Sequence, residues 1–400
     1  MVILKNIEKK GITTKCLHSS LHDEQFRSLN FPIYASSTFR FNDTDQVREV
    51  FETKNGYIYS RGKNPTVDLV AKKIALLEGT EDCFMTSSGM GAINTAVFTA
   101  VKSGDHIVSS NTLYGCTYSF FISHLKERYD VEVTLVDFDD MDAVEKAIQP
   151  NTKLIYAETL ANPTIKPVDL KKMAEIGKKH NILTMIDNTV ASAYNCNPAK
   201  FGIDVIVHSA TKYLNGHGDV VAGAICSTKE FCAKAGFEIQ KDVTGACLSS
   251  QDAYLINRGL KTYQLRCEQH NHNALEVAKF LDSHPAIKKV YYPGLENNEY
   301  HELAKKQMNG GYSGLLACEL VGGYDAANTL VNNLEVFTLA VSLGDCESLI
   351  EHPASMTHFD MDDDALAEAG IAKGLIRLSI GIENTQDIID DLKEQLDKLV

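Results

Sequence analysis

Short apolar runs alternate with segments of helical periodicity through the middle of this chain. Residues 142–149 and 169–180 carry apolar side chains three or four positions apart, as on one face of a helix. The apolar runs lie at residues 107–108, 131–136, 154–157, 183–186, 205–207 and 220–225. Runs of this kind are typical of strands buried on both faces, with helices crossing between them. The pattern predicts an α/β fold with a mostly parallel sheet covered on both sides.

Two regions of different character flank this alternating part. The N-terminal region is polar and glycine-flanked and shows no sustained period, which predicts an irregular arm. A long helical stretch over 252–283 is followed by apolar segments near Val290 and over 315–320 and 375–380, which indicate a smaller α+β unit. We therefore expect an arm over 1–62, a large domain over 63–262 and a small C-terminal domain over 263–400.

Composition narrows the class of protein. A 400-residue chain that is 44% hydrophobic can bury a sizeable core, as a globular enzyme does. Its net charge of −14 opposes nucleic-acid binding, and no run approaches the roughly 20 apolar residues of a membrane span. Charges follow directly after Leu4, so we expect no signal peptide. Ten cysteines without Cys-x-x-Cys spacing indicate reduced thiols, and hence a cytoplasmic protein. From its charge and hydropathy, we expect neither nucleic acid nor a membrane as a partner.

A short histidine pair, His270 and His272, is the main hint of a metal site. No cluster of cysteine or acidic residues accompanies it. We interpret the pair as part of a solvated helix face and expect no metal.

The segment His-Ser-Ala-Thr-Lys-Tyr-Leu-Asn-Gly at 208–216 places Lys212 just after an apolar run. A lysine held there can bond covalently to pyridoxal phosphate, and Ser209 and Thr211 can donate hydrogen bonds to its phosphate. Gly216 lets the chain turn away without a side chain in the cofactor's path. Taken alone, such a lysine is more often a solvated loop residue. Motifs elsewhere in the chain are needed to choose between a cofactor-bonding lysine and a solvated one.

Asp187 ends the apolar run 182–186, where an open α/β sheet binds its ligands. An ionised aspartate paired with the pyridine nitrogen keeps that nitrogen protonated, so that the ring can withdraw electrons. An aspartate at a strand end is more commonly a turn or helix-cap residue. The lysine downstream favours the cofactor interpretation.

A glycine-rich turn at 87–94 precedes a small-residue helical stretch. The N-terminus of a helix can hold a phosphate dianion through its unpaired N–H groups. A nicotinamide-binding fingerprint would need a third glycine where Asn94 stands. A pyridoxal enzyme is therefore favoured over a dehydrogenase.

With these motifs in view, nearly the whole chain resembles the Cys/Met-metabolism pyridoxal-phosphate enzymes. This fold-type I group includes cystathionine lyases and synthases, sulfhydrylases and methionine gamma-lyases. The matching segments are 57–61, 64–66, 88–92, 113–115, 161–164, 187–189, 209–213, 342–344, 352–358 and 376–379. The resemblance implies a fold-type I transferase-like fold with pyridoxal 5′-phosphate as cofactor.

The resemblance also assigns roles to single residues. It makes Lys212 the cofactor-bonding lysine, Asp187 the pyridine partner and Tyr114 the ring-stacking residue and proton donor. Phosphate or other cofactor contacts fall to Gly89, Met90, Ser209, Thr211 and Asn162. Arg377, with Ser342, binds the substrate carboxylate, since guanidinium pairs with it through two parallel hydrogen bonds. An arginine alone is as commonly a surface ion pair, but apolar Ile376 and Leu378 indicate a strand here.

Tyr59 and Arg61 lie in the arm, far along the chain from the cofactor motifs. In the family, the matching pair reaches the phosphate of a neighbouring subunit. The resemblance thus implies at least a dimer, and a homotetramer built from two dimers that share active sites. A Tyr-Ser-Arg loop by itself is usually an ordinary solvated loop.

The distal part of the substrate pocket discriminates within the family. Cys116 stands where relatives that process cystathionine commonly carry glycine, and Lys241 with Asp242 falls in a region expected near the same pocket. Together they resemble the branch that cleaves methionine. Cys116 can contact a thioether or relay a proton to Tyr114, or it can be a small core residue.

The expected activity is a carbon–sulfur lyase reaction on a small sulfur amino acid. It is gamma-elimination of L-methionine to methanethiol, 2-oxobutanoate and ammonia. Other members of the scaffold stay open: cystathionine gamma-lyase, homocysteine or cysteine desulfhydrase, and the gamma-replacement transferases cystathionine gamma-synthase and O-acetylhomoserine sulfhydrylase. A non-catalytic protein on the same fold is the alternative from another class. Retention of Lys212, Asp187, Tyr114 and Arg377 together argues against it.

Overall fold

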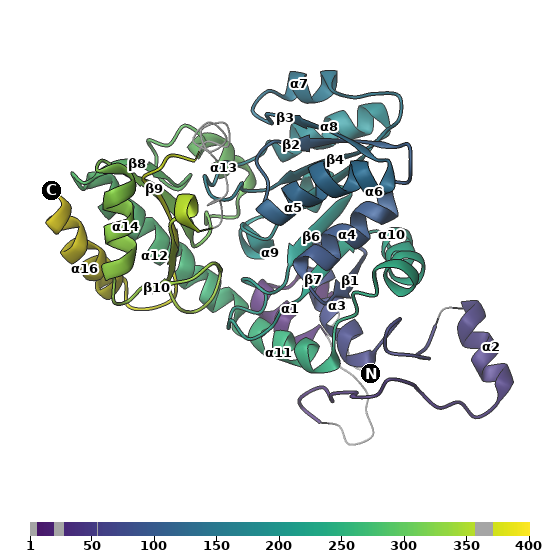
Figure 1. Cartoon of the computed structure of the whole chain (residues 1–400). Helices are drawn as coiled ribbons and strands as arrows, with labels where there is room; N and C mark the ends of the chain where they lie inside the picture. The colour runs from purple at the N-terminus through teal and green to yellow at the C-terminus, as the bar shows by residue number, and fades with distance from the viewer. Residues whose placement is uncertain (1–5, 20–27, 54, 357–370) are drawn as a thin grey trace.

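The computed structural model describes residues 6–19, 28–53, 55–356 and 371–400. Residues 357–358 of the family-like segment 352–358, and the start of the chain up to Lys5, lie outside these ranges. Figure 1 shows a large central body, a smaller body that contains the C-terminus, and an extended N-terminal segment that reaches away from both.

A seven-stranded sheet forms the centre of the large body. Its strand order is β1-β7-β6-β5-β4-β2-β3, and β7 runs opposite to the other six strands. The strands are β1 (Asp82–Thr86), β2 (His106–Ser110), β3 (Glu132–Val136), β4 (Thr152–Glu158), β5 (Leu183–Asp187), β6 (Val205–Ser209) and β7 (Gly223–Ser227). The predicted mostly parallel sheet is confirmed.

Successive residues of each strand belong to different cores, because side chains alternate across a sheet. Ile186 and Ile206 pack with α3 (Pro65–Glu78) and α8 (Leu170–His180). Met185 and Val205 pack instead with α4 (Gly89–Ala100). Helices therefore cover both faces, as the apolar runs predicted. The other helical elements here are α5 (Gly115–Ser119), η2 (Phe120–Leu125), α6 (Lys126–Tyr129), α7 (Met141–Lys146), α9 (Ser192–Asn195), η3 (Pro198–Phe201), α10 (Lys229–Lys234), η4 (Ala235–Thr244) and α11 (Ser250–Leu260).

The smaller body is an α+β unit, as predicted. Its sheet has the order β10-β11-β12-β9-β8. The strands are β8 (Ile287–Tyr291), β9 (Leu315–Leu320), β10 (Thr338–Leu339), β11 (Leu349–Glu351) and β12 (Leu375–Ser379), and the helical elements are α12 (Tyr263–Ser283), α13 (His301–Gln307), α14 (Gly323–Asn333), η5 (Pro353–Ser355), α16 (Thr385–Leu396) and η6 (Asp397–Leu399).

The helical stretch expected over 252–283 is two helices, not one. Helix α11 ends at Leu260 and α12 begins at Tyr263. Within α12, Tyr263 and Cys267 belong to the core of the large body, whereas Ala274 and Leu281 belong to the small core. One helix thus contributes to both cores, and the boundary proposed at 262/263 stays a prediction.

The N-terminal arm is less irregular than expected. It contains η1 (Ile7–Lys9), α1 (Ile12–His18) and α2 (Thr44–Thr53). Cys16 of α1 is 1% exposed, and its carbonyl accepts a 2.6 Å hydrogen bond from Lys73 of α3. Helix α2 has no buried residue and lies at the far end of the extended segment (Figure 1). A single buried position in α1 is too weak a signal for sequence periodicity to detect.

The prediction that the histidine pair is solvated is wrong for His270 and right for His272. The His270 ring is 1% exposed, its Nδ1 atom lies 2.7 Å from the Ile380 carbonyl, and burial lowers its pKa to about 4. His272 is exposed. His270 is thus a neutral core residue of α12. Across the parts of the chain that the structure describes, no helix is both long and apolar enough to cross a membrane.

Candidate active site

Lys212 lies in the turn that follows β6, at the carboxyl end of the large sheet. Its side-chain Nζ donates a 2.9 Å hydrogen bond to Ser342 Oγ, which comes from the smaller body. Burial lowers the pKa of Lys212, and the nearby charge of Asp345 opposes this shift. Gly216 ends the turn with φ 72°, and a Cβ there would lie 1.7 Å from Arg266, so only glycine fits. The lysine is therefore held where the two bodies meet.

Asp187 and Glu158 stand side by side at the ends of β5 and β4, since the strand register pairs them. Asp187 accepts a 2.9 Å hydrogen bond from the Thr189 N–H. Desolvation raises the pKa of both carboxyls, that of Glu158 to about 8 with a further contribution from Asp187. A cation that pairs with Asp187 would restore its charged form. This position therefore suits a partner such as a protonated pyridine nitrogen.

The N-terminus of α4 closely approaches the end of β6. A Cβ on Gly89 would lie 2.8 Å from Ser209 Cβ, so this approach depends on glycine. Ser88 caps the helix by accepting a 2.9 Å hydrogen bond from Gly91 N–H. The structure thus brings Gly89 and Ser209 together, as a phosphate site at a helix N-terminus requires.

Two other predicted phosphate contacts have partners within the chain. The Thr211 hydroxyl donates to the Ala222 carbonyl at 3.2 Å and accepts from the Ala222 N–H at 2.9 Å. This hydroxyl must reorient before it can donate to a phosphate. The Met90 sulfur accepts a 3.8 Å contact from the Thr117 hydroxyl, which packs Met90 against α5.

Tyr114 immediately precedes α5, with its backbone N–H donating a 2.6 Å hydrogen bond to Glu158 Oε1. Its side chain is 47% exposed, and its hydroxyl accepts a 3.5 Å hydrogen bond from the Cys116 thiol. The contact with Cys116, followed by burial, raises the pKa of Tyr114 to about 12. At neutral pH Tyr114 is therefore a phenol that still has a proton to give.

Arg377 lies on β12 and is 6% exposed. One terminal nitrogen pairs with Glu351 at 3.0 Å and donates to Asn162 Oδ1 at 3.2 Å. The other donates to the Ser342 carbonyl at 2.9 Å. Its Nε is buried without a hydrogen-bond partner among the described residues. The guanidinium is thus fixed in place with donor capacity left for a carboxylate.

Four predicted site residues are not brought to this site within one chain. Lys241 and Asp242 on η4 pair with each other at 3.3 Å. The Arg61 guanidinium lies 5.7 Å from the Tyr59 ring centre, and the Tyr59 side chain is 50% exposed. Over the described ranges, no hydrogen bond or ion pair joins any of the four to Lys212, Asp187, Tyr114 or Cys116.

Sequence reasoning missed several buried polar residues that support the site. Besides Glu158 and Glu351, these include Glu78 of α3, which lies 2.5 Å from His208 Nε2 and accepts a 2.8 Å hydrogen bond from Asn188. All three members of this network are at most 1% exposed. Glu78 ends an apolar helix, and its partner is 130 residues away. Sequence spacing carries no signal for such a contact.

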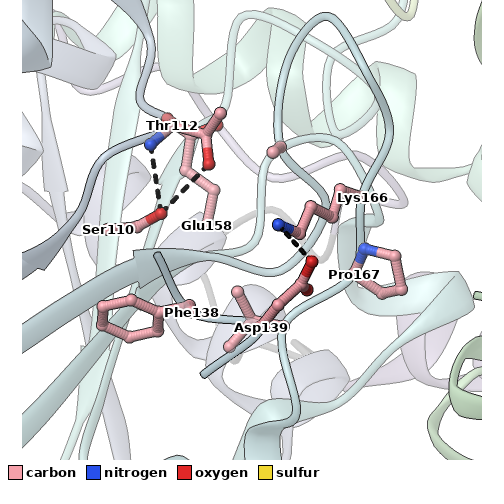
Figure 2. A pocket seen from close by; sticks show the side chains of 9 residues that line it. Ser110, Thr112, Phe138, Asp139, Glu158, Lys166 and Pro167 are labelled. Atoms are coloured by element: carbon pink, nitrogen blue, oxygen red, sulfur yellow. Dashed lines mark hydrogen bonds and ion pairs between the residues drawn. The ribbon is translucent and has the colours of Figure 1, made fainter. Parts of the chain in front are cut away.

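A small pocket borders Glu158 (Figure 2). Its Lys166 is paired with Asp137 at 2.8 Å and with Asp139 at 2.5 Å. Apart from Glu158, none of the residues that line it belongs to the site above. We therefore place the functional site at Lys212 and not in this pocket.

The residues present fit pyridoxal phosphate. Asp187 supplies a carboxylate whose charged form needs a cation, and the contact of Gly89 with Ser209 forms a cradle that a Cβ would fill. Lys212 and Arg377 are joined through Ser342, whose hydroxyl and carbonyl they bind. Lys212 and the residues predicted to contact the pyridine ring, the phosphate and the substrate carboxylate thus lie around one end of the sheet.

We expect the buried Glu158 to make folding stability depend on pH. Its folded-state pKa of about 8 lies above the ordinary 4.5, so stability falls as pH rises between these values. Glu158→Gln lacks this contribution to the pH dependence. As pH rises, the free energy of unfolding of Glu158→Gln should therefore increase relative to that of the parent by up to about 1.4 kcal/mol per pH unit. Urea unfolding of the cofactor-free chain from pH 5 to 8 checks this, with exposed Glu127→Gln as control. A pH-independent difference between Glu158→Gln and the parent would contradict the assignment.

Comparisons with known proteins agree with this geometry. Residues 13–397 match the family model of the Cys/Met metabolism PLP-dependent enzymes. An L-methionine gamma-lyase of Porphyromonas gingivalis is 48% identical over 99% of both chains. A cystathionine beta-lyase of Lactococcus lactis subsp. cremoris is 42% identical over 97% of this chain and 99% of its own.

Among solved structures, a Campylobacter jejuni chain described as a candidate O-acetylhomoserine (thiol)-lyase superposes with a TM-score of 0.93. It is 38% identical and covers 97% of this chain and 100% of its own. It contains N′-pyridoxyl-lysine-5′-monophosphate. The likeness thus extends over the whole fold and includes a cofactor-bearing lysine in that relative.

Proposed function

The chain belongs to the Cys/Met metabolism PLP-dependent enzymes, and we propose that within this family it catalyses gamma-elimination of L-methionine. The products are methanethiol, 2-oxobutanoate and ammonia. The observation that carries the choice of substrate is the Cys116 thiol 3.5 Å from the Tyr114 hydroxyl, in a chain 48% identical to a methionine gamma-lyase. Measuring kcat/KM for methionine, homocysteine, cystathionine and cysteine tests it, and methionine should rank first.

Each site residue has a defined task in this reaction. Bound pyridoxal phosphate withdraws the electrons left when a bond to the alpha carbon breaks. Arg377 fixes the substrate carboxylate, and the freed Lys212 amine takes the alpha proton. The Lys212 amine, once it has passed that proton on, takes a second proton from the beta carbon, and the Tyr114 phenol protonates the departing sulfur. Water then hydrolyses the remaining enamine to 2-oxobutanoate and ammonia. The raised pKa of Tyr114 keeps this proton in place at neutral pH.

Replacing Cys116 tests its proposed contact with the thioether. Cys116→Ala should lower kcat/KM for methionine about tenfold, the scale of one lost contact in a specificity pocket. Cystathionine cleavage should change less, because relatives that process it commonly have glycine here. Cys247→Ala is the matched control, since Cys247 is also an exposed free thiol. An equal loss of kcat/KM for both substrates would show that Cys116 does not determine substrate specificity.

We propose that the partner of the chain is a second copy of itself. The arm carries exposed apolar side chains, with Leu29 98% and Phe51 66% exposed, and its part around α2 extends away from the body (Figure 1). A second copy can cover them and receive Tyr59 and Arg61 at its phosphate site. Two such dimers make the expected tetramer. All ten cysteines are free thiols, which supports a reducing compartment such as the cytoplasm.

Mixing two inactive variants tests this sharing. Lys212→Ala lacks the lysine of its own site, and Arg61→Ala lacks the contact given to the neighbour's site. A mixed dimer has one site with both residues intact, so activity should return to about a quarter of the parent's specific activity, reflecting one intact site in half of the dimers. Unfolding and refolding the mixture allows subunits to exchange. Activity that stays at the level of the separate variants would contradict a shared site.

A further inference from the structure

Asp345 is a buried carboxylate near Lys212 that takes no part in the proposed reaction steps. It lies in the loop between β10 and β11 and is 7% exposed. Its Oδ1 is buried without a hydrogen-bond partner in the described part of the chain. Its carboxylate interacts with the charge of Lys212, with the Ser342 side chain and with the backbone of Gly218. A buried carboxylate that keeps an unpartnered oxygen beside the central lysine calls for an explanation.

The local hydrogen bonding links Asp345 to the lysine. Lys212 Nζ donates to Ser342 Oγ at 2.9 Å, so the hydroxyl proton of Ser342 must point to another acceptor. The Asp345 carboxylate lies beside that hydroxyl and can accept it. The three side chains thus form a series from ammonium to hydroxyl to carboxylate.

The surrounding charges make Asp345 the available partner for a Lys212 ammonium. Among the residues that the structure describes, Asp345, Arg377 and Glu351 are the charged groups that act on the lysine. Arg377 disfavours a second positive charge, and Glu351 is already paired with Arg377 at 3.0 Å. Asp345 itself faces Lys212 and the exposed Glu347. A buried ammonium without a counter-charge is costly, and Asp345 alone among the three can compensate it.

We propose that Asp345, acting through the Ser342 hydroxyl, is the positioning residue that stabilises Lys212 as an ammonium. In the proposed reaction, on which this role in turnover rests, the Lys212 amine accepts the alpha proton while the electron pair of the broken C–H bond stays with the substrate. The lysine gains one positive charge, and Asp345 balances it without changing its own protonation. Asp345 therefore sets the pH range over which Lys212 exchanges protons.

The protonation of Lys212 can be measured without substrate or cofactor. The full-length chain, freed of cofactor, is acetylated with acetic anhydride at a series of pH values, and the Lys212 peptide is quantified by mass spectrometry. The midpoint of Lys212 reactivity should fall by about one pH unit or more in Asp345→Asn, because a nearby negative charge is lost. Asp345→Gly, which leaves no amide to bury, should behave in the same way. Glu347→Gln, which removes an exposed carboxylate two positions away, should leave the midpoint in place.

The loaded enzyme supplies a second readout. The pH midpoint of its visible absorption, which reports the protonation of the Lys212 nitrogen, should shift in the same direction. In Asp345→Asn, kcat should fall by about a hundredfold at most, the lower end of the range for one acid–base group, because Lys212 itself remains, with KM nearly unchanged. An unchanged acetylation midpoint in both Asp345 variants would overturn the proposal. Because that measurement uses no substrate, its result is independent of whether methionine is the substrate.

Discussion

Lys212→Ala is expected to abolish turnover while the fold is retained. In the proposed reaction the lysine both bonds the cofactor and moves the alpha proton, so the loss should reach at least about ten-thousandfold in kcat, the upper range for a single acid–base group. In the structure its side chain makes one hydrogen bond, to Ser342, worth about 1 kcal/mol, and its charge faces the buried Asp345, so the free energy of unfolding should fall while the native fold is kept. Product release from methionine and urea unfolding measure the two effects.

A matched control shows whether the effect is specific to Lys212 or follows from removing any lysine. Lys178→Ala removes an exposed lysine of α8. It should match the parent in both measurements. Activity near that of the parent in Lys212→Ala would refute the assignment of the central residue.

Arg377→Ala should cause the second large effect, a loss of both substrate binding and folding stability. In the proposed reaction the variant loses the group that binds the substrate carboxylate, and it also breaks the buried ion pair with Glu351, which is 2% exposed. Removing one member of a buried ion pair costs about 3 to 5 kcal/mol of folding stability. We expect a lower free energy of unfolding and a much raised KM, measured by urea unfolding and steady-state kinetics.

A double variant distinguishes these two origins. Arg377→Ala combined with Glu351→Gln removes both charges of the buried ion pair, so stability should largely return. The KM for methionine should stay high, because the carboxylate still lacks its guanidinium. Arg377→Lys keeps a charge but cannot form two parallel hydrogen bonds, and it should be intermediate in KM. A double variant with normal KM would show that Arg377 acts only as the partner of Glu351.

Sequence patterns predicted the large sheet well because its strands are buried on both faces. Continuous apolar runs such as 205–207 in β6 are typical of that environment, and the structure places them there. The patterns failed for helices that bury few residues or that contribute to both hydrophobic cores. Helix α1 buries only Cys16, and α12 changes from one core to the other along its length, so neither shows a clean period.

At the site, the residues in short motifs were predicted and their buried partners were not. Lys212, Ser209 and Asp187 lie at strand ends, where a motif and its structural context coincide in the sequence. Glu158, Glu351 and Glu78 act through partners 26 to 130 residues away, which only the fold brings near. Over the described residues, no hydrogen bond or ion pair joins Tyr59, Arg61, Lys241 or Asp242 to the site, and their roles stay predictions. Those of Tyr59 and Arg61 depend on a second copy of the chain.

The most direct test is the stoichiometry of products formed from L-methionine by the cofactor-loaded protein. Methanethiol, 2-oxobutanoate and ammonia should appear in equal amounts, with cystathionine a poor substrate, and Lys212→Ala should form none of them. Pyruvate from cystathionine or cysteine, with methionine inert, would contradict the account and make this chain a different carbon–sulfur lyase on the same scaffold.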